Sequence, residues 1–105
     1  MYEVLVLCSA GMSTSMLVEK IKKEIEKKEV NLNIQAVSIT EGKFLIKKEE
    51  YDLLLLGPQV AFMKEQMEHL VNGKCPVRVI NSTDYGMMNA DNVLTSIMET
   101  LNNRK

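Results

Sequence analysis

The amino-acid sequence predicts an α/β fold, a single three-layer domain in which helices cover both faces of a four-stranded parallel sheet. The chain has 105 residues, which suits one domain spanning residues 1–105. Apolar residues make up 46% of the chain and charged residues 26%, a composition typical of a globular protein with a core. The spacing of apolar residues switches repeatedly between strand-like and helix-like periods, and this alternation predicts a mostly parallel sheet.

The first half of the chain predicts a strand, a helix and a second strand. Residues 2–7 form an almost continuous apolar run, which indicates a strand. Residues 13–28 predict a helix with one apolar face and one face of lysine and glutamate. The apolar face carries Leu17, Val18, Ile21 and Ile25. Residues 32–37 alternate between apolar and polar, which indicates a strand with one more solvent-exposed face. For residues 40–50 we predict a loop with a short helical turn.

The second half repeats the alternation. The run "YDLLLLG" at residues 51–57 predicts an apolar strand that the following proline stops, and a helix then extends to about residue 71. The apolar stripe of this helix consists of Met63, Met67 and Leu70. Residues 76–80 predict a short alternating strand, residues 81–91 a loop and residues 90–101 a last helix.

The apolar patterns also predict the strand order. Strands buried on both faces read as continuous apolar runs, so residues 2–7 and 51–57 are expected at the centre of the sheet and the alternating strands at its edges. The order 2-1-3-4 with right-handed crossovers satisfies this. Ligands of such sheets bind at the carboxyl ends of the strands, near the point where the order reverses. This places Cys8 and the turn at residues 57–59 at the candidate site.

Cys8 stands where the first strand gives way to the first helix, and small or hydroxyl residues surround it. The loop after it consists of Ser9, Ala10, Gly11, Met12, Ser13, Thr14 and Ser15. Backbone N–H groups at a helix start form an anion site, and a thiol held there is favoured as the nucleophilic thiolate. The loop therefore suits a cysteine that carries a phosphoryl group, rather than a cysteine that merely fills a strand end. We expect hydroxyl hydrogen bonds from Thr14 and Ser15, and a helix cap from Ser13.

Three segments carry a resemblance to a known family: "VLVLCSAGMSTSMLVEKI", "YDLLLLGPQVAFM" and "PVRVINSTDYGMMNADNVL". Together they resemble the enzyme IIB components of the lactose/cellobiose branch of the bacterial sugar phosphotransferase system, over nearly the whole chain. The resemblance implies a fold similar to that of low-molecular-weight tyrosine phosphatases. It implies that phosphohistidine on a IIA component phosphorylates Cys8, and that Cys8 passes the group to a sugar bound in the membrane component IIC. Cellobiose, chitobiose, lactose and other β-linked disaccharides stay open.

A phosphatase or an arsenate reductase is the rival class, because those enzymes use a Cys-x5-Arg loop. Here the sixth position after Cys8 is Thr14, so the arginine that would grip phosphate is absent. Asp84 is a candidate general acid by its place after the fourth strand, but Tyr85 follows it instead of proline, and a turn-forming role is favoured. Tyr85 is expected beside the cysteine loop, and Gln59 completes the candidate rim.

His69, Cys75 and the methionines are further candidates for a functional role. His69 lies off the apolar stripe of its helix and is interpreted as a solvated residue rather than a second carrier. Cys75 lacks partner spacing and is interpreted as a spare thiol; without a CxxC motif a redox module is disfavoured. The methionines are either scattered core filling or an adaptable apolar rim around Cys8 that docks two partners in turn. That rim would comprise Met12, Met16, Met87 and Met88.

Composition limits the remaining classes. The net charge of −1 gives no general attraction to nucleic acid or membrane, and the run "EKIKKEIEKKE" is a solvated helix face. The sequence shows no signal peptide and no apolar stretch long enough to span a bilayer. We expect a cytoplasmic subunit with reduced thiols, monomeric when free, without metal or organic cofactor.

Overall fold

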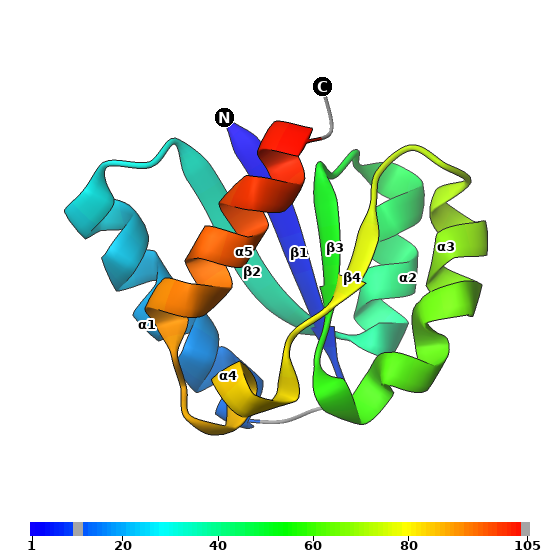
Figure 1. The fold of residues 1–105 in the computed structure, drawn as a ribbon. Coiled ribbons are helices and arrows are strands. Elements are labelled where there is room, and N and C mark those ends of the chain that lie inside the picture. The colour runs from blue at the N-terminus through cyan, green and yellow to red at the C-terminus, as the bar shows by residue number, and fades with distance from the viewer. Residues whose placement is uncertain (10–11, 104–105) are drawn as a thin grey trace.

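A computed structural model describes residues 1–9 and 12–103 of the chain (Figure 1). Strands and helices alternate along it, as predicted. The elements are β1 (Tyr2–Cys8), α1 (Met12–Lys28), β2 (Leu32–Ser38), α2 (Ile39–Lys48), β3 (Leu53–Leu56), the 3₁₀ helix η1 (Pro58–Met63), α3 (Lys64–Val71), β4 (Val77–Val79), α4 (Ser82–Gly86) and α5 (Ala90–Asn103). Within the described residues, no helix combines the length and the apolar character needed to cross a membrane.

The four strands form one parallel sheet in the order β2-β1-β3-β4, which confirms the predicted order. β1 pairs with β2 along its whole length, from Tyr2 opposite Leu32 to Cys8 opposite Ser38. On its other side β1 pairs with β3. Because all strands run the same way, their carboxyl ends lie along one edge of the sheet, at the bottom of Figure 1.

Alternate residues of the central strands face two separate apolar clusters. Val4 and Val6 belong to the cluster that includes the apolar faces of α1 and α5. Leu5 and Leu7 belong to the cluster that includes Met67 and the half-buried side chains of α2. Both clusters are built on β1, so nearly all of its side chains are removed from water. This explains why β1 is a continuous apolar run in the sequence.

The prediction of a loop with only a short helical turn at residues 40–50 is wrong, because Ile39–Lys48 form the helix α2. The Ser38 side chain begins the helix by accepting a hydrogen bond of 3.2 Å from the backbone N–H of Glu41. Gly42 faces the sheet, where a Cβ atom would lie only 2.1 Å from Cδ2 of Leu7. The missing side chain at this position lets α2 pack closely on β1.

Two smaller expectations are also corrected. The segment at residues 81–91 contains the short helix α4, because the Asn81 side chain accepts hydrogen bonds from the backbone N–H groups of Thr83 and Asp84. In α3, Leu70 lies 37% exposed although it was predicted in the apolar stripe. Val71 takes the buried place in the last turn beside Met67.

The packing of α2 predicts that Gly42→Ala lowers the free energy of unfolding by about 1–3 kcal/mol, because the new methyl group meets a fully buried leucine. Gly86→Ala is the matched control, because a Cβ atom there has no neighbour within 4 Å. Urea denaturation followed by circular dichroism measures both variants. Equal stability of Gly42→Ala and the wild type would contradict this account of the helix–sheet contact.

Candidate functional site

Cys8 is the last residue of β1 and lies at the carboxyl edge of the sheet. It is buried, and its Sγ donates a hydrogen bond of 3.5 Å to the carbonyl oxygen of Val37 in β2. Its backbone is fixed by the pairing of Cys8 with Ser38. The thiol is therefore carried by one of the most buried elements of the molecule, at the end where the chain leaves the sheet.

Helix α1 begins at Met12, four residues after the thiol. The N–H groups of its first turn have no partner within the helix and make that turn suitable for an anion. Ser13 lies inside the first turn instead of capping it, and Ser9, Ser13 and Ser15 are exposed. The loop residues Ala10 and Gly11, and the side chain of Met12, lie outside the described residues.

Thr14 differs from its serine neighbours, because its side chain is 1% exposed. Its hydroxyl lies 2.8 Å from the hydroxyl of Tyr85, and the two form a buried hydrogen bond between α1 and α4. Tyr85 thus packs at the start of α1, as expected from the sequence. The Thr14 hydroxyl was expected to serve the anion site, and the structure shows it engaged with Tyr85.

The exit of β3 lies against the same region. The backbone N–H of Gly57 donates a hydrogen bond of 2.9 Å to the carbonyl oxygen of Leu7. A Cβ atom on Gly57 would lie 3.3 Å from Oε1 of Gln59 and 3.8 Å from Oγ1 of Thr14. The structure therefore brings Gln59 and Thr14 to the same glycine, next to the end of β1.

Asp84 is held within its own turn and to α5. Its backbone N–H donates to the Asn81 side chain at 3.0 Å, and its Oδ1 accepts a hydrogen bond of 3.2 Å from Asn92. The carboxylate is half-buried. The Asp84 backbone is thus part of the α4 turn, and its carboxylate is oriented by Asn92.

Two of the four methionines predicted for a rim are strongly exposed. Met16 is 55% exposed and Met87 is 74% exposed. Met88 is only half-exposed and packs against the core that includes Tyr85, which corrects its assignment to the rim. Phe62 in η1, which sequence reasoning missed, is 80% exposed on the segment that leaves β3.

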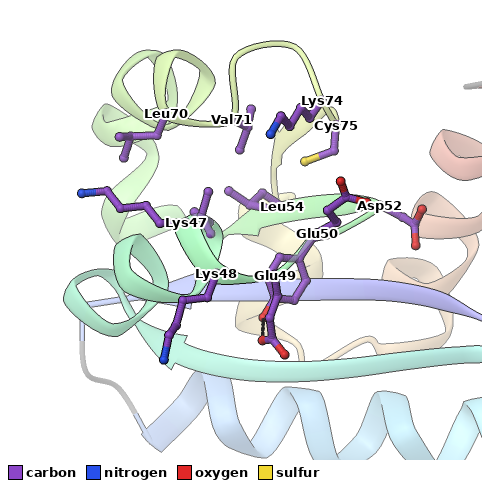
Figure 2. A pocket seen from close by; sticks show the side chains of 12 residues that line it. Lys47, Lys48, Glu49, Glu50, Asp52, Leu54, Leu70, Val71, Lys74 and Cys75 are labelled. Atoms are coloured by element: carbon purple, nitrogen blue, oxygen red, sulfur yellow. Dashed lines mark hydrogen bonds between the residues drawn. The ribbon is translucent and has the colours of Figure 1, made fainter.

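A cavity lies at the opposite edge of the sheet (Figure 2). Its volume is about 640 Å³, and its lining comes from the end of α2, the end of α3 and the segments that enter β3 and β4. Cys75 lines it, whereas Cys8 does not. Tyr51 donates a hydrogen bond of 2.9 Å to Glu49 there, and burial together with that carboxylate raises the pKa of Tyr51 to about 12.

His69, which lies in α3, is exposed, as predicted.

No group of three or more histidine, cysteine, aspartate or glutamate side chains suited to a metal ion occurs in the part of the chain that the structure describes. At the carboxyl edge, the described residues bring together one thiol, the backbone at a helix start and a buried hydroxyl pair. This combination suits a nucleophile and an anion.

Comparison with known proteins extends these observations. Residues 3–96 match the family model described as PTS system, lactose/cellobiose specific IIB subunit. Over 99 residues the chain is 38% identical to the galactose-specific EIIB component of Lactococcus lactis subsp. cremoris, covering 90% of this chain and 92% of that protein. Identity and coverage are the same for the cellobiose-specific EIIB component of Lactococcus lactis subsp. lactis.

A solved structure shows the same fold. The solution structure of the cellobiose-specific IIB component from Borrelia burgdorferi superposes with a TM-score of 0.76 at 38% identity, covering 97% of this chain and 93% of that one. IIB domains have a fold similar to that of low-molecular-weight phosphatases, which agrees with the sheet order found here.

Proposed function

Because the chain belongs to the lactose/cellobiose-specific IIB subunit family of the sugar phosphotransferase system, whose members are phosphotransferases, we propose that it carries a phosphoryl group on Cys8. The donor is phosphohistidine on a IIA component. The acceptor is a β-linked disaccharide bound in the membrane component IIC, and transfer takes place on the cytoplasmic side of the membrane. The observation that carries this proposal is the position of Cys8, at the end of a central strand and four residues before α1.

The proposed reaction has two balanced steps. The Cys8 thiolate attacks phosphorus, an S–P bond forms, the P–N bond to histidine breaks, and the imidazole nitrogen keeps the electron pair. A sugar hydroxyl then attacks the same phosphorus, an O–P bond forms, the S–P bond breaks, and the hydroxyl proton leaves to solvent. Between the steps, the N–H groups of the first turn of α1 stabilise the phosphoryl oxygens.

The absence of arginine from the described first turn supports a carrier over a phosphatase. Thr14 occupies the sixth position after Cys8, and its hydroxyl is bound to Tyr85. Asp84 is the candidate general acid, and its Oδ1 accepts a hydrogen bond from the side-chain amide of Asn92. A phosphocysteine at this site would lack the arginine cation that favours hydrolysis.

The identity of the sugar is left open, and one of the relatives is named for a monosaccharide rather than a disaccharide. The two Lactococcus relatives are equally similar to this chain and are named for galactose and for cellobiose. Similarity in the IIB component therefore does not select the sugar, and we place sugar recognition in IIC.

Cys8→Ser is expected to abolish stable phosphorylation, because the sulfur nucleophile is lost. Cys75→Ser is the matched control and should accept one phosphoryl group, because Cys75 lies at the opposite edge of the sheet. Intact-mass analysis after incubation with a complete phosphoryl relay measures both variants. A full-stoichiometry adduct on Cys8→Ser would overturn the assignment.

The protein is expected to hydrolyse a chromogenic aryl phosphate far more slowly than a phosphatase does, because Thr14 supplies no positive charge. Release of the chromophore in a continuous assay measures this. Turnover at ordinary phosphatase rates that disappears on Cys8→Ser would favour the phosphatase class instead.

We further expect Met16→Lys/Met87→Lys to slow phosphorylation by phospho-IIA while leaving the unfolding midpoint almost unchanged. Both side chains are exposed, and flexible thioethers suit a surface that meets two partners in turn. Leu70→Lys, an exposed apolar position of α3, is the control. Wild-type transfer rates in the double variant would rule out this docking role, and global unfolding would show that the side chains belong to the core.

A further inference from the structure

We propose that the buried hydrogen bond between Thr14 and Tyr85 is a positioning device that holds the first turn of α1 in register with Cys8 for phosphoryl transfer. The inference rests on the proposed function and assigns to these two residues a role in it. Neither hydroxyl needs to touch the phosphoryl group. The bond acts through the backbone of α1, whose N–H groups hold the phosphoryl oxygens.

The burial of Thr14 is the first observation. Apart from tyrosine and cysteine, it is the one buried polar side chain among the described residues, at 1% exposure. A buried hydroxyl without a partner is costly, and here the partner is the hydroxyl of Tyr85 at 2.8 Å. The bond joins residues 71 positions apart, so it fixes two distant segments relative to each other.

The local structure around Tyr85 is the second observation. The Asn81 side chain accepts hydrogen bonds from Thr83 and Asp84, and the backbone N–H of Tyr85 donates to the carbonyl oxygen of Asn81 at 2.9 Å. Downstream, the N–H of Asn89 donates to the carbonyl oxygen of Asp84 at 2.8 Å. These hydrogen bonds fix the backbone of α4. Tyr85 is 8% exposed and belongs to the apolar cluster that includes residues of α5. Tyr85 is therefore a rigid support.

The third observation is the place where the bond lies. Thr14 is the third residue of α1, within the turn whose N–H groups lack helical partners. Cys8 is fixed by its pairing in the sheet, and the end of β1 is tied to Gly57 through the carbonyl of Leu7. Thr14 lies against that glycine as well. Cys8 and the first turn of α1 are thus each held in place, the one by the sheet and the other by Tyr85.

Loss of the bond between Thr14 and Tyr85 is expected to change the geometry of phosphoryl transfer rather than the affinity for phospho-IIA. With no arginine in the described first turn to grip the phosphoryl group, the backbone N–H groups must be aimed at it, and small misplacements of reacting groups are costly. Loss of the bond should slow the chemical step at saturating donor while the concentration of phospho-IIA at half-maximal rate stays the same.

Five variants test this in rapid-mixing assays with phospho-IIA as donor. Thr14→Val keeps the shape and removes the hydroxyl, Thr14→Ser keeps the hydroxyl, and Tyr85→Phe removes the partner. The double variant Thr14→Val/Tyr85→Phe tests whether the two act as a unit. Tyr51→Phe is the matched control, because it deletes the same atom from a buried tyrosine at the opposite edge of the sheet.

We expect Thr14→Val, Tyr85→Phe and the double variant to lower the saturated transfer rate by a similar factor, about 10- to 100-fold. Thr14→Ser and Tyr51→Phe should transfer at close to the wild-type rate. Thermal unfolding of each variant gives the folded fraction at the assay temperature. Slow transfer that persists after correction for this fraction supports positioning.

Wild-type rates in Thr14→Val and Tyr85→Phe, or a loss fully accounted for by unfolding, would overturn the positioning role. An equal loss in Thr14→Ser would also overturn it, because the hydroxyl would then not be the group that matters. These outcomes differ from failure of the proposed function, in which the wild-type protein itself takes up no phosphoryl group on Cys8.

Discussion

The parallel pairing of β1 between β2 and β3 is the constraint on which the remaining structure depends. It removes the central side chains of β1 from water on both faces, with exposure of 1% or less from Val4 to Leu7. It also directs the carboxyl ends of all strands to one edge. The segments that leave β1, β3 and β4 are thereby brought together, although they are far apart in sequence. The position of the candidate site follows from this topology, and the residues at that edge determine what chemistry it supports.

Much of the fold could be predicted because apolar periodicity reports burial directly. The continuous runs of β1 and β3 and the alternation of β2 were sufficient for the strand order. Helix α2 was missed because its apolar residues are only half-buried and a glycine lies at its closest contact with the sheet. A usable signal was present, since Ser38 and Glu41 have the spacing of a helix start. Capping chemistry would have identified this helix where periodicity did not.

Some features of the candidate site could likewise be predicted from the sequence, and others could not. Helical phase placed Met16 on the surface correctly, because a regular helix has a fixed period. The same reasoning had no basis in the segment around Met88, whose backbone adopts a φ of 53° and whose side chain packs on the core. The sequence placed Tyr85 near the cysteine loop but could not reveal its bond to Thr14. Two hydroxyls 71 residues apart acquire a relationship only through the assembled sheet.

The sixth position after Cys8 links the fold to the proposed carrier role. An arginine there would extend toward the phosphoryl group and place its charge on it. Thr14 instead turns into the protein and is bound to Tyr85, so the position contributes fixed geometry without charge. In the proposed carrier role, backbone N–H groups hold the phosphoryl oxygens, and this requires that the helix start is held in place. In the proposed mechanism, the Thr14–Tyr85 bond would hold the anion site in place at a position that carries no arginine, so that no cation there would promote hydrolysis of the phosphocysteine.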